Sequence, residues 1–473
     1  MLFNKVLVAN RGEIAVRIIK TLTRLGVGSV AVYSEADRDS PHVHLADEAV
    51  AIGPAPARDS YLQGARIIAA ARQTGAGAII PGYGFLSENA GFAEQCAAAG
   101  LVFVGPTPRQ IRDFGLKHTS RELAHQAGVP LTPGTGLLAD VGEALAAAEH
   151  LGYPVMLKST AGGGGIGMTR CDDAAQLAAA FDTVQRQGLN YFGNSELFLE
   201  RYIASARHLE VQIFGDGRGN VIALGERDCS LQRRNQKVVE ETPAPGISPA
   251  RRQSLLDAAV SLGRSVGYQS AGTVEFIYDT ARDDFYFLEV NTRLQVEHPI
   301  TEMVTGIDLV EWMVRTAAGE PPDFAQLAIR PVGAAMEVRI YAEDPANQFL
   351  PSPGTLTRVR FPADIRLDGW VGDGTVVSPH YDPMLAKLIV HGHDRVDALL
   401  RLRRALAATR LEGIATNLAY LRQVVHGDLF TSGQMTTRAL DSFVFPPPGA
   451  PPVPPTTLKV LQAAIDQHLR RAS

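Results

Sequence analysis

One stretch of the sequence decides the fold: Lys158-Ser159-Thr160-Ala161-Gly162-Gly163-Gly164-Gly165-Ile166-Gly167. The apolar run that leads into it, residues 154–158, predicts a β-strand that ends on Lys158. Because glycine has no side chain, the run that follows lets the backbone approach phosphate groups and donate successive N–H groups to them. A Walker P-loop places its lysine after the glycines, whereas here the lysine precedes them. This order favours a nucleotide site covered by a mobile glycine-rich lid.

Two strand patterns downstream form the strongest constellation, Thr273-Val274-Glu275-Phe276-Ile277-Tyr278 and Phe285-Tyr286-Phe287-Leu288-Glu289-Val290-Asn291. If they form a hairpin whose turn centres on Arg282, Glu275 and Glu289 face each other with Cβ atoms about 5 Å apart. Because side chains alternate along a strand, one face of the second strand should carry Phe285, Phe287, Glu289 and Asn291.

The facing carboxylates predict a metal site, because two such groups repel each other unless a cation lies between them. Mg²⁺, or Mn²⁺ in its place, favours oxygen ligands and typically takes one or two protein carboxylates together with nucleotide phosphates. The alternative is a polar strand that faces solvent. Four polar residues that follow at once argue against this alternative: Arg293, Gln295, Glu297 and His298.

A basic segment precedes the hairpin, since residues 228–237 contain Arg233, Arg234 and Lys237. Alone, such a segment is more often a solvated turn. Beside a metal-binding hairpin it favours a clamp for ATP phosphates and a small anion. The order of strand, lysine and glycine lid is similar to that of ATP-grasp nucleotide sites.

The first hundred residues alternate short apolar runs with helical patterns, and the apolar runs lie at residues 6–9, 30–33, 78–80 and 102–104. This alternation predicts a doubly wound α/β domain with a parallel sheet. The turn after the first run, Asn10-Arg11-Gly12-Glu13, differs from G-x-G-x-x-G, and Glu13 would repel a pyrophosphate. We therefore do not expect a dinucleotide site here.

Composition excludes several classes of protein. A formal net charge of −5 offers no overall basic surface for nucleic acid. No apolar stretch approaches the roughly 20 residues of a membrane span, and no secretory or transit segment precedes the first strand. The cysteines Cys96, Cys171 and Cys229 lack metal-ligand spacing, which is typical of free thiols in a reducing compartment. We expect a cytoplasmic protein without nucleic-acid or membrane partners.

Several motifs together resemble those of biotin carboxylases, and they lie at residues 9–15, 81–89, 228–237, 289–299 and 341–345. The resemblance runs from about residue 2 to residue 446. It implies an N-terminal α/β domain (1–113), an ATP-grasp core (114–330) with a lid at about 131–203, and a C-terminal α+β domain (331–446). A proline-rich linker and a tail helix would follow at 447–473.

Site residues follow from the resemblance, position by position. It implies ATP contacts from Lys117, Lys158, Gly163, Gly164, Gly165, Gly167, Glu200, His208, Gln232 and Asn235. It implies that Glu275 and Glu289 bind Mg²⁺ with support from Asn291, in agreement with the hairpin. It implies that bicarbonate is bound by Lys237, Arg293, Gln295 and the backbone of Val296.

The resemblance also implies a reaction. Glu297 would be the general base that deprotonates bicarbonate for attack on the γ-phosphate of ATP. The carboxyphosphate formed would release CO₂ and phosphate, the phosphate would deprotonate biotin, and Arg339 would stabilise the biotin enolate. Burial or a neighbouring anion would raise the pKa of Glu297 toward the working range. A closed lid would keep water away from carboxyphosphate.

Three residues depart from the pattern of bacterial acetyl-CoA carboxylases, namely Ile80 for histidine, Ile166 for arginine and Asn235 for histidine. Residues 158–161, 191–193 and 308–312 instead resemble the biotin carboxylase module of urea or guanidine carboxylases. The sequence leaves urea, guanidine and an acyl-CoA open as final acceptors.

Partners are expected on other chains, because the sequence contains no Met-Lys-Met and no carboxyltransferase segment after residue 446. These partners are a biotin carboxyl carrier protein and a carboxyltransferase, and the chain itself is expected to form a homodimer. Two alternatives remain: another ATP-grasp ligase, such as a carbamoyl-phosphate-forming enzyme, and a catalytically silent ATP-binding scaffold. The tail stripe Leu458, Leu461, Ile465 and Leu469 predicts a helix that either folds back or docks a partner.

Overall fold

The computed structural model describes residues 2–160, 167–327, 329–441, 443 and 445. The predicted lid glycines Gly163, Gly164 and Gly165 therefore lie outside the described residues, and so does the predicted tail helix. Among the described residues, no helix combines the length and apolar character needed to cross a bilayer.

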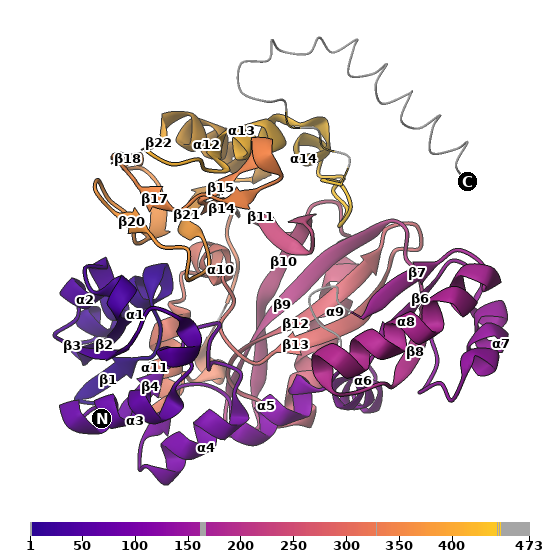
Figure 1. The fold of residues 1–473 in the computed structure, drawn as a ribbon, viewed down its shortest axis with the longest axis horizontal. Helices are drawn as coiled ribbons and strands as arrows, with labels where there is room; N and C mark the ends of the chain where they lie inside the picture. Colours follow the sequence, from indigo (N-terminus) through magenta and orange to yellow (C-terminus); the bar gives the residue numbers. More distant parts are fainter. Residues whose placement is uncertain (1, 161–166, 328, 442, 444, 446–473) are drawn as a thin grey trace.

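The N-terminal region is a parallel five-stranded sheet in the order β3-β2-β1-β4-β5. Figure 1 shows β1 to β4 in indigo near the N-terminus. Its strands are β1 (Lys5–Val8), β2 (Gly28–Ser34), β3 (Glu48–Gly53), β4 (Ala78–Ile80) and β5 (Val102–Phe103). Val6 and Val8 pack toward α1 (Gly12–Arg24) and α11 (Leu309–Ala317), whereas Leu7 packs toward α3 (Gly64–Thr74) and α4 (Ala90–Ala98). Helices thus cover both faces of the sheet, as predicted.

A second sheet has eight strands in the order β13-β12-β9-β10-β11-β14-β21-β19, and each neighbouring pair is antiparallel. These strands are β9 (Ala206–Asp216), β10 (Val221–Arg233), β11 (Gln236–Thr242), β12 (Gln269–Asp279), β13 (Asp284–Asn291), β14 (Ala334–Tyr341), β19 (Arg366–Gly369) and β21 (Met384–Gly392). The pairing of β11 with β14 carries the sheet across residues 330 and 331. The domain division at that point stays a prediction.

Helices cover this sheet on both sides. α9 (Pro249–Ser265) contacts β9 and β10, and α10 (His298–Thr305) contacts β11, β14 and β21. α12 (Arg395–Ala408) contacts β14 and β21 from the opposite face. Alternate residues of β14 show this arrangement, since Met336 and Val338 pack with α12 whereas Ala335 packs with α10. The site residues at the start of α10 are thereby held against the sheet.

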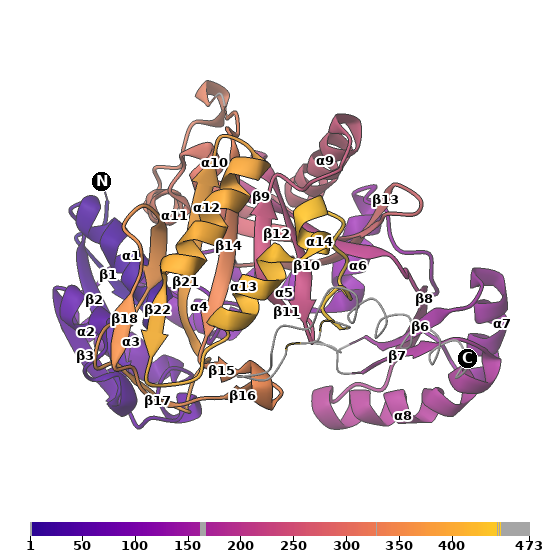
Figure 2. The ribbon, with the colours of Figure 1, turned by 90° about the horizontal axis from the view of Figure 1, so that it is seen from above.

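Residues 141–201 form a separate layer with its own core, seen on the right in Figure 2. Its sheet has the order β7-β6-β8 and comprises β6 (Val155–Ser159), β7 (Met168–Cys171) and β8 (Leu197–Arg201). Helices α7 (Val141–Leu151) and α8 (Ala174–Phe192) pack on this sheet. Lys158 lies near the end of β6, at the edge of the predicted lid.

The remaining elements are short. They are α2 (Pro41–Leu45), α5 (Pro108–Gly115), α6 (Lys117–Gln126), α13 (Leu418–His426), α14 (Asp428–Ser432), β15 (Glu343–Asp344), β16 (Leu350–Pro351), β17 (Gly354–Thr355), β18 (Arg358–Arg360), β20 (Val376–Val377) and β22 (Arg410–Glu412).

The β12–β13 hairpin confirms one prediction and corrects another. Glu275 pairs with Glu289, as the sequence predicted, but Phe276 pairs with Phe287, so Leu288 is an extra residue in β13. Such a bulge interrupts the alternation of side chains. Phe285 and Phe287 therefore pack in the core, whereas Leu288, Glu289 and Asn291 line a cavity. The prediction that Phe285, Phe287, Glu289 and Asn291 share one face is wrong.

Candidate active site

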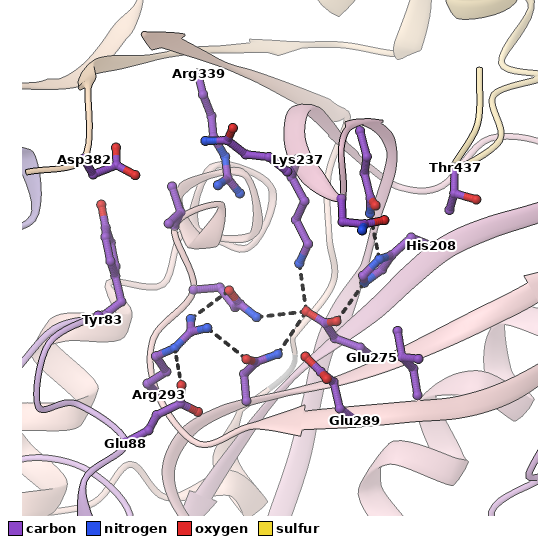
Figure 3. A pocket seen from close by; sticks show the side chains of 18 of the residues that line it. Tyr83, Glu88, His208, Lys237, Glu275, Glu289, Arg293, Arg339, Asp382 and Thr437 are labelled. Atoms are coloured by element: carbon purple, nitrogen blue, oxygen red, sulfur yellow. Dashed lines mark hydrogen bonds and ion pairs between the residues drawn. The ribbon is translucent and has the colours of Figure 1, made fainter. Parts of the chain in front are cut away.

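A cavity of about 1040 Å³ lies between the two large sheets and the 141–201 layer, and Figure 3 shows part of its lining. It brings together most of the predicted site residues: Lys117, Lys158, Glu200, His208, Gln232, Asn235, Lys237, Glu275, Glu289, Asn291, Arg293, Gln295, Val296 and Arg339. Glu297 is fully buried and does not line the cavity. Gly167, which has a φ of 76°, does not line the cavity. Its carbonyl oxygen accepts a hydrogen bond from Ser159 N (2.8 Å).

Glu275 is the most heavily contacted acid of the site. Its Oε1 accepts hydrogen bonds from Lys237 Nζ (2.8 Å) and Asn291 Nδ2 (2.9 Å), and its Oε2 lies 3.0 Å from His208 Nε2. Burial alone would raise the pKa of Glu275, but Lys237 and then His208 outweigh burial and lower it. Glu275 is therefore ionised.

The side chain of Glu289, opposite, has no hydrogen bond or ion pair with any other described residue. Burial, and then the charge of Glu275, raise its pKa, against the nearby Lys117. A carboxylate without a partner that faces an ionised carboxylate fits the oxygen ligand set of Mg²⁺. Asn291 uses its amide nitrogen on Glu275 and its Oδ1 on Arg293 Nη2 (2.9 Å), so in this structure it positions the acids.

Lys237 lies at the centre of three carboxylates. Its Nζ donates to Glu210 Oε2 (2.6 Å), Glu297 Oε1 (2.7 Å) and Glu275 Oε1 (2.8 Å). Burial opposes the charge, but Glu210 and then Glu275 raise the pKa of Lys237 well above its usual value. Ligand atoms of His208, Glu210 and Glu275 lie within 4.8 Å of one another, and the ammonium group of Lys237 already compensates their charge.

Glu297 lies directly before α10, between two cations. Besides Lys237, Arg339 Nη2 donates to its Oε2 (2.9 Å). Burial alone would raise the pKa of Glu297, but Lys237 and Arg339, followed by Arg227, hold it well below its usual value. The predicted upward shift of this pKa is therefore wrong for the protein without substrates, because three cations outweigh the cost of burial.

Arg293 is held at the mouth of the acid cluster. Its Nε donates to Glu88 Oε2 (2.8 Å), its Nη1 to Gln295 Oε1 (2.9 Å) and its Nη2 to Asn291 Oδ1 (2.9 Å), as Figure 3 shows. Gln295 in turn donates to Glu275 Oε1 (3.1 Å). The carbonyl of Val296 accepts a hydrogen bond from Lys387 Nζ (2.7 Å). These contacts give an anion-binding arrangement of fixed geometry.

Cationic side chains from two layers meet at the Glu275–Glu289 end of the cavity. Lys158 on β6 and Arg121 on α6 both pair with Glu200 on β8. His208 Nδ1 lies 2.8 Å from Gln232 Nε2, and Asn235 lies in the β10–β11 turn with a φ of 64°. Apolar side chains complete this end: Met156, Met168, Ile203, Ile277 and Leu288. Charged groups beside an apolar slot suit a nucleotide.

Sequence reasoning missed several acids that position the cations. Glu210 pairs with both Lys237 and Arg227, Glu88 pairs with Arg293, and Glu240 pairs with Arg339. Glu210 lies two residues after His208 and so shares its strand face, a signal that could have revealed it. Glu88 lies in one of the family-like motifs.

Comparison with known proteins identifies the family of the chain. Residues 2–111 match "Biotin carboxylase, N-terminal domain", residues 117–324 match "Carbamoyl-phosphate synthase L chain, ATP binding domain", and residues 337–442 match "Biotin carboxylase C-terminal domain". A urea amidolyase of Lachancea kluyveri is 57% identical over 445 residues, which are 94% of this chain and 24% of the relative. The chain thus spans about a quarter of that protein.

A biotin carboxylase of Halalkalibacterium halodurans is 50% identical over 439 residues, which cover 92% of this chain and 97% of the relative. Among solved structures, the biotin carboxylase domain dimer of Hydrogenobacter thermophilus 2-oxoglutarate carboxylase, in complex with MgADP and bicarbonate, has a TM-score of 0.87. It is 44% identical and the match covers 93% of this chain and 98% of that one. The chain therefore belongs to the biotin carboxylase family of ATP-dependent carboxylating ligases.

Proposed function

We propose that this chain carboxylates biotin borne by a carrier protein, with ATP and bicarbonate as the other substrates. One observation carries the proposal. Glu275 and Glu289, an acid pair suited to Mg²⁺, line one cavity. Lys237 contacts both Glu275 and the buried Glu297, and Arg339 also contacts Glu297.

Glu275 and Glu289 would hold Mg²⁺, and bound metal would neutralise charge on the ATP phosphates. Lys158, Lys117 and His208 lie on the same side of the cavity as this pair and would contact the nucleotide. Arg293 and Gln295, fixed by their mutual hydrogen bond, would orient bicarbonate.

Glu297 is the proposed general base. Its low pKa keeps it ionised, so it is ready to accept a proton. When substrates bind, the anionic bicarbonate and phosphates would offset the positive charges of Lys237 and Arg293. Ionised Glu297 would then be stabilised less by these cations, so its pKa would rise. Bicarbonate oxygen would then attack the γ-phosphorus, ADP would leave, and the carboxyphosphate formed would split into CO₂ and phosphate.

Arg339 is the proposed contact for biotin. It lines the cavity and donates to Glu297 from its Nη2. Once phosphate has taken the proton from the biotin nitrogen, the guanidinium would stabilise the negative charge on the ureido oxygen while the nitrogen attacks CO₂.

The wider assembly is also a proposal. Similarity to a urea amidolyase and to the urea carboxylase of Kluyveromyces lactis (48% identity, TM-score 0.78) supports a urea-type acceptor. We propose a biotin carrier protein and a carboxyltransferase as partners, and a cytoplasmic location. The dimer of the Hydrogenobacter domain supports a homodimer.

The test measures ADP formation by the full chain with MgATP, bicarbonate and free biotin. We expect ADP formation to require bicarbonate and to rise with biotin. Glu297→Gln should lower it by about 100-fold or more, the range expected for a general base. ADP formation that depends on neither bicarbonate nor biotin would contradict the proposal.

A further inference from the structure

A second pair of facing carboxylates lies outside the cavity, beneath α10. Glu240 on β11 pairs in register with Glu337 on β14, and both side chains are fully buried. Ile300 and Val304 of α10 cover this part of the sheet by packing on Ala335 of β14 and Ile389 of β21. Neither acid lines the cavity, so substrates do not reach them.

The two acids have unequal contacts. Glu240 Oε1 accepts a hydrogen bond from Arg339 Nε (2.6 Å), whereas Glu240 Oε2 and both oxygens of Glu337 have no hydrogen-bond partner. Buried polar atoms are rarely left without partners, so these three oxygens require an explanation. The charged groups that act on the pair lie on β9, β11, β14, β21 and directly before α10: Glu210, Lys237, Arg339, Lys387 and Glu297.

Protonation explains the unpartnered oxygens. Two carboxylates opposite each other in a buried layer cannot both ionise readily, and a protonated carboxyl group is a hydrogen-bond donor. Burial raises the pKa of Glu337 well above its usual value, although Lys387 opposes this, and the charge of Glu240 adds to it. A protonated Glu337 would carry a donor, and Glu240 Oε2, opposite it in register, is an acceptor without a partner.

We propose that Glu240 is a positioning residue for Arg339, and that Glu337 holds Glu240 in place through one proton shared between their carboxyl groups. The inference rests on the proposed function, which places Arg339 beside biotin. Arg339 donates from Nε to Glu240 and from Nη2 to Glu297, and these two contacts together fix the plane of its guanidinium.

The kinetic test removes the acceptor for Arg339 with Glu240→Leu and measures ADP formation with free biotin. We expect kcat for the biotin-dependent reaction to fall by about 10-fold or more while the KM for ATP stays within 2-fold. In an Arg339→Gln background the same substitution should change kcat by less than 2-fold, because the group that it positions is already absent. Equal losses in both backgrounds would overturn the proposal.

Glu241→Leu is the matched control. Glu241 is the next residue of β11, is equally buried, and pairs with Arg395 Nε (2.7 Å), away from the cavity. The control should keep the biotin-dependent kcat within 2-fold, even where it lowers thermal stability as much as Glu240→Leu does. A kcat loss in the control that matches the loss in Glu240→Leu would show a structural effect and overturn the positioning role.

Glu337 provides a rescue test. A glutamine amide can donate to Glu240 Oε2 as a protonated carboxyl group does, so Glu337→Gln should keep kcat within 2-fold. Glu337→Leu has no donor and should lower kcat by about 5-fold or more. If glutamine is as harmful as leucine, Glu337 acts as a carboxylate and the shared proton is wrong.

Crystal structures of these variants separate this inference from the proposed function, because they need no activity. We expect the contact between Arg339 Nη2 and Glu297 to be lost in Glu240→Leu and kept in Glu337→Gln. Retention of that contact in Glu240→Leu overturns the positioning role, whereas wild-type protein that lacks biotin-dependent ADP formation overturns the proposed function alone.

Discussion

Single carboxylates determine how the proposed metal is held, and Glu275 and Glu289 differ in this respect. Glu275 already contacts Lys237, Asn291 and His208, while Glu289 has no such partner among the described residues. If they share Mg²⁺, Glu275→Gln and Glu289→Gln should each raise the Mg²⁺ concentration needed for half-maximal ADP formation by roughly 10-fold or more. A titration with MgCl₂ at saturating ATP measures this.

A control for that titration is Glu241→Gln, which removes a buried carboxylate that does not line the cavity. It should leave the Mg²⁺ requirement unchanged. If both metal-pair variants also keep the wild-type Mg²⁺ requirement, the metal does not bind between them.

The pH dependence of the reaction should report on Arg339. Lys237 and Arg339 hold the pKa of Glu297 well below its usual value, so wild-type activity should not lose this base until acidic pH. Arg339→Gln removes one cation and raises the pKa of Glu297. The acid limb of kcat/KM for bicarbonate, measured as ADP formation without biotin, should therefore move to higher pH by about 1 unit. An unmoved limb would show that another group controls it.

Residue identities allowed part of the site to be predicted. The Glu275–Glu289 pair followed from strand alternation around a turn, which is local information. The contacts of Glu297 with Lys237 and Arg339 join residues 60 and 42 positions away. No spacing rule relates residues on different elements at such separations, so the low pKa of Glu297 could not be predicted from the sequence.

At the scale of elements, the closest approach in the large sheet involves Gly215 on β9. A Cβ atom there would lie 1.8 Å from the carbonyl oxygen of Tyr268, directly before β12. Gly215→Ala should therefore destabilise the protein by about 2 kcal/mol or more, since the backbone itself must move. The measurement is thermal or urea-induced unfolding.

Gly372→Ala is the matched substitution, because a Cβ atom there meets no atom within 4 Å and the backbone needs no positive φ. Its stability should lie within about 0.5 kcal/mol of wild type. Equal stabilities for the two alanine variants would mean that β9 and Tyr268 separate at little cost.

Elements were largely predictable, and their irregularities were not. Apolar runs gave the strands that became β1, β2, β4 and β12, because burial selects apolar residues at a fixed period. The bulge at Leu288 could not be predicted from the sequence, because a bulge changes the pairing of a strand without changing its composition. The largely exposed strand β3 has too few buried side chains for a clear pattern.

At the scale of the whole molecule, the β11–β14 pairing joins residues from both sides of the predicted boundary at 330. A fragment of residues 1–330 would leave β11 as an open edge and expose Val238 and Val239, which pack with Met336. We expect this fragment to aggregate or to unfold without cooperativity. A fragment of residues 1–445, analysed by size-exclusion chromatography and calorimetry, should remain folded. Cooperative melting of the shorter fragment would instead support the predicted division.

The final acceptor is also tested on the whole assembly. Ile80, Ile166 and Asn235, together with similarity to urea amidolyases, predict turnover with urea or guanidine. Reconstitution with the carrier and carboxyltransferase of the same organism should show acceptor-dependent ADP formation with one of these compounds. Turnover with acetyl-CoA or propionyl-CoA alone would show that the similarity misleads about the acceptor.

The eight-stranded sheet has a consequence for how efficiently ATP is used. Glu275 on β12 and Arg339 on β14 lie four strands apart, but Lys237 and Glu297 join their side chains through hydrogen bonds of 2.8, 2.7 and 2.9 Å. Because these contacts and the hydrogen-bonded strands fix both side chains, CO₂ would always cross the same short path between its formation and its capture. Wasted ATP is measured as the ratio of ADP formed to biotin carboxylated, which equals one when no CO₂ is lost. This ratio then depends on how well the cavity retains CO₂. It should stay constant with temperature until the sheet itself melts.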